Sequence, residues 1–473
     1  MHRARTMPDH FPDLQEIPMH PLLQRRALLA KRLPGTLALI FNGTERPRNY
    51  PGNPHPFRPD SHFLYFCGVL PPGSVVLLDG GEAHLFMDPV TRDEAVWSGP
   101  GPDWAELERV LQARIHPRTE LEAFLDGLGR SRLATLPSQD PATTAEQNLL
   151  LGRSPDLQED SPDGLLARAV IELRLRHDQA AREELRKVCK VTVQAHLDGM
   201  AATRVGGDEG DVLAAMMSAC LRQGFGTSFQ PIVTISGERL HQPHVGGPLR
   251  EGDLLLADFG AEAATGWAGD VTNTWPVSGT YTPRQRDVYS VVLEAHRRAA
   301  ARVQPGTRYR EVHLEACRAT AEGLVALGLL KGVPEDLVER DAHALFFPHG
   351  IGHLLGLDVH DMEDLGDLAG YAPGRVRSTR FGLRWLRLDR DLEEGFAVTI
   401  EPGFYWIPEL LEDPVRRQAY ADCVDWDQVE SFREVRGIRI ERDYLVTDSG
   451  HELLTPGLPD EPEAVEAAVG GRS

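Results

Sequence analysis

The chain contains 473 residues, of which 41% are hydrophobic and 26% are charged, and its formal net charge is −21. This length favours two domains, because single cores rarely grow beyond about 250–300 residues. The acidic charge argues against a nucleic-acid partner, since phosphate binding requires clustered Lys and Arg. No apolar run approaches the length of a membrane span, about 18 residues, so no membrane partner is expected.

The first third of the chain alternates short apolar runs with turn residues. Residues 36–41 (TLALIF) and 74–78 (SVVLL) are predicted strands, with prolines and glycines frequent between them. Residues 153–164 (RSPDLQEDSPDG) are acidic and contain Pro and Gly, which indicates a linker or an exposed loop. The predicted domains are therefore residues 1–164 and residues 165–473.

The second part alternates helical segments with strand-like ones, which predicts an α/β fold. A long helix is expected from Asp178, with apolar residues along one face and charges on the opposite face. Strands are expected to end at Asp258 and at Glu401, and another is expected to begin at Asp270, across a glycine-containing hairpin from the first. The run GIRIE at 437–441 alternates apolar and polar residues with the period of two that is typical of a strand.

Cysteine usage and the N-terminal segment indicate a cellular compartment. The five cysteines are scattered and include no C-x-x-C pair, which favours reduced, buried thiols over a disulfide scaffold. The N-terminal segment MHRARTMPDHFPDLQ contains no apolar stretch of the kind found in signal peptides. A cytoplasmic location is therefore expected.

Four carboxylates lie at the ends of predicted apolar strands, namely Asp258, Asp270, Glu401 and Glu441. One such carboxylate is ordinarily an exposed strand end or half of an ion pair. Four of them with few Lys or Arg nearby indicate a shared counter-charge, because burying an unpaired carboxylate is costly. Two divalent cations would supply four positive charges to balance them.

Three histidines fall close together, at His349, His353 and His360, and glycines lie between them. A lone histidine among apolar residues is more often a core group, but three interleaved with glycines, which let backbones approach closely, favour a site. The spacing of His349 and His353 is that of a zincin helix, yet Gly350 stands where the catalytic Glu would be. The sequence therefore does not support a zincin.

Three further blocks of sequence carry a family resemblance, FFPHGIGHLLGLDVHD at 346–361, VTIEPGFY at 398–405 and GIRIERDYLVTDSG at 437–450. Together with DFG and GDVT around Asp258 and Asp270, they resemble the pita-bread-fold metallopeptidases, specifically aminopeptidase P and prolidase. The resemblance implies a smaller N-terminal creatinase-like domain, a C-terminal pita-bread catalytic domain, and short peptides with proline second as substrates. It also implies a homodimer or a homotetramer.

The resemblance assigns catalytic roles residue by residue. The implied metal ligands are Asp258, Asp270, His353, Glu401 and Glu441. Glu401 is also the implied proton shuttle to the leaving amine. His241 and His360 are implied to contact the substrate carbonyl, with His244 as the alternative to His241.

Four other residues are implied to lie around this centre. His349, Arg439 and Tyr405 are expected to orient ligands, balance charge or contact substrate. Trp97, in the run DEAVWSG, is a further candidate of the same kind. The oxygen-rich ligand set with one histidine suits two Mn(II) ions, with Co(II) or Zn(II) as possible substitutes.

Two features of the hairpin depart from the family pattern. Asp258 and Asp270 are twelve residues apart (270 − 258), which is one more than the family spacing, and Asn273 stands where relatives often carry Arg. Both changes lie near the implied metals and can alter geometry or metal preference. All five implied ligands are nevertheless retained.

The resemblance leaves two proline exopeptidases open. The block NPHPFRPDSHFLYFCGVLPPGSVVLL at 53–78 resembles aminopeptidase P, whereas GLRWLRLDRDLEEG at 382–395 and an insertion after Tyr405 resemble prolidase. In the prolidase alignment, Arg387 falls where the free carboxylate of a dipeptide is held, and the alternative is an ordinary surface arginine. The longer match favours an Xaa-Pro aminopeptidase, with an Xaa-Pro dipeptidase as the alternative.

Other classes on the same fold are disfavoured. A non-catalytic binding module and a metal-free creatinase-like hydrolase are both expected to lack this set of ligands, and fold alone does not decide between classes. A methionine aminopeptidase is disfavoured by the sizeable N-terminal domain.

Overall fold

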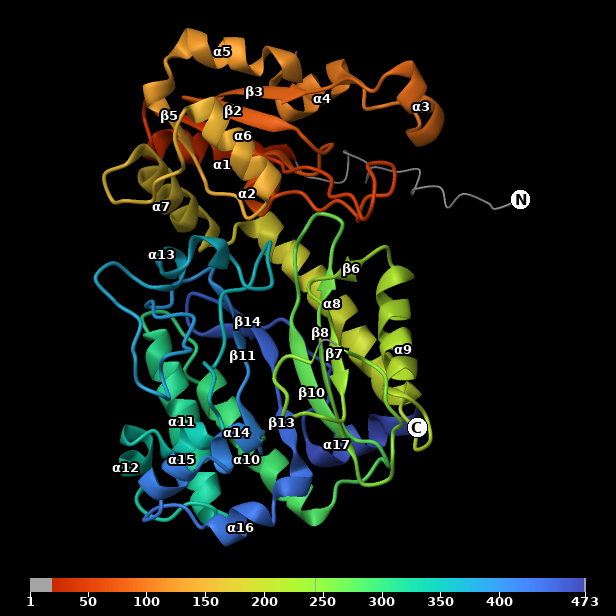
Figure 1. The fold of residues 1–473 in the computed structure, drawn as a ribbon, viewed down its shortest axis with the longest axis vertical. Coiled ribbons are helices and arrows are strands. Elements are labelled where there is room, and N and C mark those ends of the chain that lie inside the picture. The colour runs from red at the N-terminus through yellow and green to blue at the C-terminus, as the bar shows by residue number, and fades with distance from the viewer. Residues whose placement is uncertain (1–18, 243, 472–473) are drawn as a thin grey trace. The chain divides into compact units, whose positions relative to one another are not determined.

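The computed structural model describes residues 19–242 and 244–471, and the chain divides into two compact units, Met1–Arg174 and Leu175–Ser473 (Figure 1). The boundary expected at 164/165 falls inside helix α7 (Pro162–Arg174). This helix packs on β5 and α1 of the first unit. Its buried Asp163 accepts a hydrogen bond of 2.8 Å from the backbone N–H of Thr135, so the helix stays with the first unit.

The first unit is built on a five-stranded mixed sheet in the order β4-β3-β2-β1-β5. Strands β1, β2 and β3 are antiparallel neighbours, whereas β5 pairs with β1 and β4 pairs with β3 in parallel. The sheet strands are β1 Leu37–Phe41, β2 Val75–Asp79, β3 Glu82–Met87, β4 Arg114–Pro117 and β5 Leu133–Thr135. Every residue of β1 is buried, so both faces of this interior strand are covered.

Among the described residues, six α-helices precede α7 in this unit, and α5 and α6 complete the core. Leu121 and Leu125 of α5 and Leu150 and Leu151 of α6 pack in one cluster with the sheet residues Leu37, Leu39, Val75 and Leu77. The helices are α1 Met19–Arg32, α2 Ser61–Cys67, α3 Arg92–Ser98, α4 Trp104–Leu111, α5 Leu121–Leu128 and α6 Pro141–Leu151.

The second unit opens with the long helix predicted from Asp178, which is α8 (Gln179–Ala202). The Asp178 carboxylate caps it by accepting a hydrogen bond of 2.9 Å from the backbone N–H of Ala181, as aspartate at this position commonly does. Helices α8 and α9 (Glu209–Leu221) pack together, as do α10 (Pro283–Ala300) and α11 (Tyr309–Ala326). In Figure 1 the strands of this unit lie between these two helix pairs.

Three small sheets position the carboxylates. Strand β8 (Leu254–Phe259) lies between β10 (Val271–Pro276) and β7 (Ile232–Thr234), and all three are antiparallel. Strand β11 (Ala397–Ile400) pairs with β14 (Arg442–Val446), and β12 (Gly403–Tyr405) pairs with β13 (Gly437–Arg439). The remaining strands are β6 Gly226–Thr227, β9 Ala261–Glu262 and β15 His451–Leu453.

Short helices complete the unit. They are α12 Pro334–Glu339, α13 Asp367–Gly370, α14 Pro408–Leu411, α15 Pro414–Ala419, α16 Trp426–Glu430 and α17 Pro462–Ala468. Short 3₁₀ turns in the two units span Arg118–Glu120, Arg130–Arg132, Ala342–Leu345, Glu363–Leu365, Arg433–Val435 and Val469–Gly471. Within the described residues, no helix is both long and apolar enough to cross a membrane.

Strand register brings the predicted carboxylates toward one place. Asp258 lies near the end of β8 and is paired with Thr272 of β10, while Asp270 immediately precedes β10. Glu401 directly follows β11, and Glu441 lies between β13 and β14. The run at 437–441 is buried on both of its faces. Its alternation therefore does not separate core from solvent. It places apolar side chains on one face and polar side chains on the face toward the site.

Candidate metal centre

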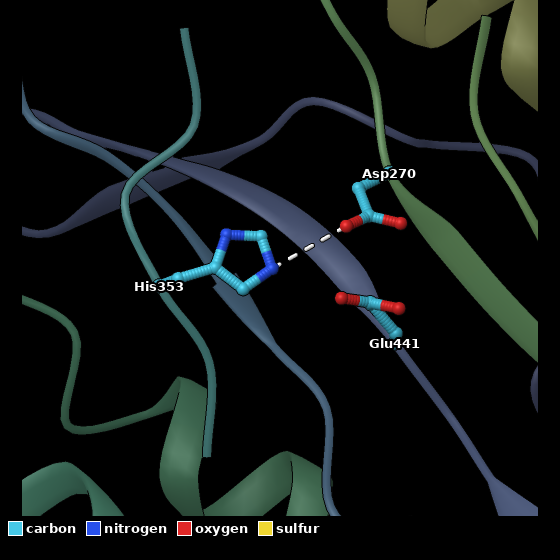
Figure 2. A group of neighbouring side chains, drawn as sticks. All are labelled: Asp270, His353 and Glu441. Atoms are coloured by element: carbon cyan, nitrogen blue, oxygen red, sulfur yellow. Dashed lines mark ion pairs between the residues drawn. The ribbon is translucent and has the colours of Figure 1, made fainter. Parts of the chain in front are cut away.

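Three side chains from distant parts of the sequence meet in the interior of the second unit. Asp270, His353 and Glu441 each offer one ligand atom, and these atoms all lie within 4.8 Å of one another (Figure 2). The Nε2 atom of His353 lies 3.4 Å from Oδ2 of Asp270, and all three residues are buried. Ligand atoms this close to one another can surround a single metal ion.

The orientation of His353 leaves one ring nitrogen for a ligand. Its Nδ1 lies 2.9 Å from the carbonyl oxygen of Leu354, so Nδ1–H donates to that carbonyl. The lone pair of Nε2 therefore faces the carboxylates of Asp270 and Glu401, whose nearest oxygens are 3.4 and 3.9 Å away. A lone pair and carboxylate oxygens repel one another unless a proton or a cation lies between them.

The carboxylates of the centre carry more negative charge than the protein neutralises. Burial raises the pKa of Asp270, with repulsion from Asp258 adding to it, and burial together with repulsion from Asp270 raises the pKa of Glu441. Burial also raises the pKa of Glu401. Oδ1 of Asp270 is buried and has no hydrogen-bond partner among the described residues. These observations fit divalent cations, which would relieve both the repulsion and the unpaired oxygen.

One arginine balances part of this charge and organises a chain of hydrogen bonds. Arg439 donates from Nη2 to Oδ2 of Asp258 at 2.5 Å, from Nε to Oγ1 of Thr272 at 3.0 Å, and from Nη1 to the Tyr405 hydroxyl at 3.1 Å. The Thr272 hydroxyl in turn donates to Oε2 of Glu441 at 2.7 Å. Arg439 therefore holds the carboxylate of Asp258 directly and that of Glu441 through Thr272.

His349 ends this chain as a neutral imidazole. Its Nδ1 donates to the carbonyl of Gly350 at 2.8 Å, so Nε2 accepts from the Tyr405 hydroxyl, also at 2.8 Å. Burial, reinforced by the charge of Arg439, lowers the pKa of His349 to about 3. Because His349 Nδ1 lies 3.7 Å from Oε2 of Glu401, the ring packs against that carboxylate without neutralising it.

Two residues that contact the centre were not predicted from the sequence. Thr272 bridges Arg439 and Glu441, and its position two residues after Asp270 in a strand was the available signal. Asp443 accepts hydrogen bonds from the backbone N–H of Asp270 at 3.1 Å and from the thiol of Cys189 at 3.2 Å. Burial raises the pKa of Asp443 to about 7, and no local pattern separates it from its charged neighbours.

A pocket of about 450 Å³ opens beside the centre. It is lined by Phe229, Gln230, Ile232, His241, Gln242, Asp258, Asp270, Val359 and His360. His360 contacts His353 edge-on, with ring centroids 4.2 Å apart. Partial burial lowers the pKa of both His241 and His360.

The hairpin that departs from the family spacing still directs both aspartates to this pocket. Asp258 and Asp270 both line it, and the intervening residues form β9 and a bridge between Glu262 and Ala268. Asn273 is buried and donates from its amide to the carbonyl of Pro459 at 3.1 Å. The extra residue is therefore absorbed within the connection, and Asn273 is used to hold the C-terminal segment.

The remaining candidates lie away from the buried group. Oε2 of Glu363 accepts hydrogen bonds from Nη1 of Arg387 at 2.6 Å and from Nδ1 of His360 at 3.2 Å. His244 is exposed and is not part of the pocket lining. Trp97 belongs to the first unit, where it lies on α3 with 91% of its surface exposed.

Known proteins resemble this chain over both units. Residues 183–448 match Metallopeptidase family M24, and residues 22–135 match the aminopeptidase P N-terminal domain. The Xaa-Pro dipeptidase of Homo sapiens is 31% identical over 92% of this chain and 89% of its own length. The Xaa-Pro aminopeptidase of Escherichia coli K12 is also 31% identical, over 94% of this chain and 96% of its own. The structure of Pseudomonas aeruginosa aminopeptidase PepP superposes with a TM-score of 0.80, at 28% identity, over 96% of this chain and 99% of that one.

Proposed function

We propose that this chain, which belongs to metallopeptidase family M24, removes the N-terminal residue from peptides whose second residue is proline. The observation that carries the proposal is the convergence of buried carboxylates and one histidine beside a pocket of about 450 Å³. The relatives named Xaa-Pro aminopeptidase and Xaa-Pro dipeptidase support the proline preference. The proposed domains are those predicted from the sequence, an N-terminal domain of residues 1–164 and a catalytic domain of residues 165–473.

Two divalent ions are the proposed cofactors. The residues that would hold them are Asp258, Asp270, His353, Glu401 and Glu441. An oxygen-rich donor set with one imidazole favours Mn(II), with Co(II) or Zn(II) as substitutes. Bound ions of this kind supply Lewis-acid chemistry, because they acidify water and polarise carbonyl oxygens.

Glu401 is the proposed proton carrier. Its carboxylate lies at the end of β11, where burial raises its pKa and brings it closer to the range in which a carboxyl both accepts and returns a proton. In the proposed reaction Glu401 takes one proton from water and gives it to the nitrogen of the departing proline. His349 packs beside Glu401 and, with its ring fixed by Tyr405, limits the positions that the carboxylate can adopt.

His241 and His360 are proposed to hold the substrate carbonyl. Both line the pocket, and the lowered pKa of His241 favours a neutral ring whose one N–H can donate to an oxygen that becomes negative. Nδ1 of His360 donates to Oε2 of Glu363 at 3.2 Å, and because this contact opposes the effect of burial on the pKa of His360, it favours the doubly protonated ring, whose Nε2–H would donate to the substrate oxygen. His244 remains the alternative to His241.

Selection for proline has a physical basis in the missing amide hydrogen. An Xaa-Pro bond has no N–H, so a peptidase that registers its substrate through that donor loses a contact. The side chains of Phe229, Ile232 and Val359 give the pocket an apolar surface suited to a pyrrolidine ring. This surface would reward proline without requiring a hydrogen bond from it.

An Xaa-Pro dipeptidase is the second candidate function, and Arg387 is the observation that favours it. Its guanidinium can form paired hydrogen bonds with the free carboxylate of a dipeptide. The pKa of His241, which lines the pocket, is lowered by burial, by the charge of Arg439 and then by the charge of Arg387. The charge of Arg387 is therefore felt inside the pocket. Pairing of Arg387 with Glu363 weighs against this candidate, and we therefore retain the aminopeptidase as the primary proposal.

The setting of the enzyme is also proposed. All five cysteines are buried free thiols, which supports a reducing, cytoplasmic location. The net charge of −21 supports peptides rather than nucleic acid as partners. A homodimer or homotetramer is proposed from the family resemblance, and light scattering on the purified protein would decide it.

The test compares matched peptides on protein reconstituted with Mn(II). An Xaa-Pro-Xaa tripeptide and the corresponding Xaa-Pro dipeptide are cleaved under identical conditions, and kcat/KM is compared. Faster cleavage of the tripeptide is expected from an aminopeptidase. A strong preference for the dipeptide would assign the second candidate function, and failure to cleave either with metals bound would contradict both.

A further inference from the structure

We propose that Glu363 sets the length preference of this enzyme by opposing the free carboxylate of Xaa-Pro dipeptides. The inference rests on the proposed function and concerns a residue that the sequence analysis did not single out. Glu363 begins the short 3₁₀ turn Glu363–Leu365, three residues after His360. One oxygen, Oε2, accepts from both Arg387 and His360.

The pairing with Glu363 engages only part of the hydrogen-bonding capacity of Arg387. A guanidinium carries five N–H donors, and Arg387 gives one of them, on Nη1, to Glu363 at 2.6 Å. The side chains of Arg387 and Glu363 are 38% and 33% exposed, so an incoming group can reach them. Within the described part of the chain the other donors of Arg387 have no partner, so a peptide carboxylate bound to them would lie beside the carboxylate of Glu363.

Glu363 brings a negative charge to a small cavity that it shares with Arg387. Glu363 and Arg387 line a small cavity of about 80 Å³ together with Leu354, Asp361 and Arg377. Oε1 of Glu363 is buried and has no hydrogen-bond partner among the residues that the structure describes. Although burial opposes ionisation of this carboxyl, its contacts with His360 and Arg387 lower its pKa to about 2, so it is negatively charged at neutral pH.

The consequence for specificity follows from charge. A dipeptide places its carboxylate immediately after proline, where it meets Arg387 and Glu363 together. In a longer peptide or a dipeptide amide, the same position carries a neutral group, which Glu363 does not repel. Glu363 therefore offsets the attraction that Arg387 would otherwise exert on dipeptides. His360 lines the pocket and also contacts Oε2 of Glu363, so it lies between the pocket and the Arg387–Glu363 pair.

The experiment uses Glu363→Gln and a pair of substrates that differ only in charge. Xaa-Pro and Xaa-Pro amide have the same length, so the ratio of their kcat/KM values isolates the carboxylate. Glutamine keeps an oxygen that can accept from Arg387 and His360, and taking a ratio cancels any general loss through His360. We expect the acid-to-amide ratio to rise about tenfold, which corresponds to about 1.4 kcal/mol.

A matched control removes the same charge from a neighbouring pair. Asp367 binds Arg377, which lines the same small cavity, but Asp367 does not contact His360 or Arg387. Asp367→Asn should leave the acid-to-amide ratio within about twofold, as expected for a partly exposed ion pair. An equal rise in both variants would show a general charge effect and would overturn the role of Glu363.

Other outcomes separate this inference from the proposed function. Cleavage with a ratio that falls, or that rises less than threefold, in Glu363→Gln would overturn the inference while leaving the exopeptidase intact. If neither peptide is cleaved with metals bound, the proposed function fails. Calorimetric binding of the same acid and amide to both proteins would then decide the role of Glu363, with the same rise in the binding ratio expected.

Discussion

The buried centre and the Arg387–Glu363 pair, which lies beyond His360 and forms the rim of the site, handle charge in opposite ways. In the centre, Asp270, His353 and Glu441 are almost completely inaccessible to solvent. The two carboxylates lack enough cationic partners. At the rim, the Arg387 and Glu363 side chains are about a third exposed and already form an ion pair. Burial raises the pKa values of the central carboxyls, whereas the contacts of Glu363 with His360 and Arg387 lower its own.

This difference separates two tasks. An excess of buried carboxylate is unfavourable unless cations occupy it, so the centre is suited to holding metal and to proton transfer. A solvent-exposed ion pair contributes little to stability, commonly about 0–1 kcal/mol, so the rim pair is free to serve selection. Changes in the centre should therefore abolish the reaction, and changes at the rim should redirect it.

The largest expected effect comes from Glu401. Glu401→Gln should lower kcat by about 10³-fold while the protein stays folded, because the proton carrier is lost and the shape of the side chain is kept. Steady-state kinetics with circular dichroism measures this. Glu452→Gln removes a carboxylate on β15 that pairs with Arg186 and should change kcat little. Activity of Glu401→Gln within about threefold of the unaltered protein would remove the proton-carrier role.

The next effect concerns metal binding at the centre. Asp270→Asn should weaken Mn(II) binding by at least about 100-fold, because a buried ligand is replaced by a neutral amide. Elemental analysis of the unaltered protein is expected to approach two equivalents per chain, and titration calorimetry gives the loss. Asp287→Asn, on the exposed side of α10, is the control. Unchanged metal content in Asp270→Asn would place the ions elsewhere.

Metal affinity should also depend on pH. The pKa values of Asp270, Glu401 and Glu441 are raised in the metal-free protein, chiefly by burial, so these carboxyls hold protons at pH values where exposed ones have lost them. Bound metal must displace those protons, so affinity falls as pH falls, by about tenfold per unit for each proton displaced. Calorimetry of Mn(II) binding at several pH values, in two buffers of different ionisation enthalpy, measures this. A pH-independent affinity with no proton release would contradict the raised values.

The smallest effect is expected at the rim. Arg387→Ala should lower kcat/KM for an Xaa-Pro dipeptide by about tenfold and that for an Xaa-Pro-Xaa tripeptide much less, since only the dipeptide presents a carboxylate after proline. The change also leaves Glu363 without its cation, which adds to the loss for the dipeptide. Equal losses on both substrates would return Arg387 to the role of a surface charge.

Local patterns were sufficient to predict much of the fold. The run predicted as a strand at 36–41 is β1 (Leu37–Phe41), and the helix predicted from Asp178 is α8, because apolar periodicity and an N-terminal cap are local properties. The α/β fold class and the metallopeptidase family are confirmed by the structure and by the relatives. The domain boundary was harder to place, since α7 stays with the first unit through contacts with strands far away in the sequence.

The site was only partly accessible to sequence reasoning. The structure brings Asp270, His353 and Glu441 together, whereas the roles assigned to them stay predictions. Glu363 and Asp443 could not have been ranked from the sequence, because their importance lies in hydrogen bonds across strands and loops, and Thr272 was indicated only by its place two residues after Asp270. His244 and Trp97 are exposed, and their assignment rests on the family resemblance alone.

The most direct measurement follows N-terminal residue release from an Xaa-Pro-Xaa tripeptide and its Xaa-Ala-Xaa counterpart, with protein that is either chelator-treated or reconstituted with Mn(II). A buried metal centre beside a proline-selective pocket predicts release from the proline peptide only with Mn(II), with kcat/KM higher than for the alanine peptide by at least about 100-fold. Full activity in the chelator-treated protein, or no preference for proline with metals bound, would contradict it.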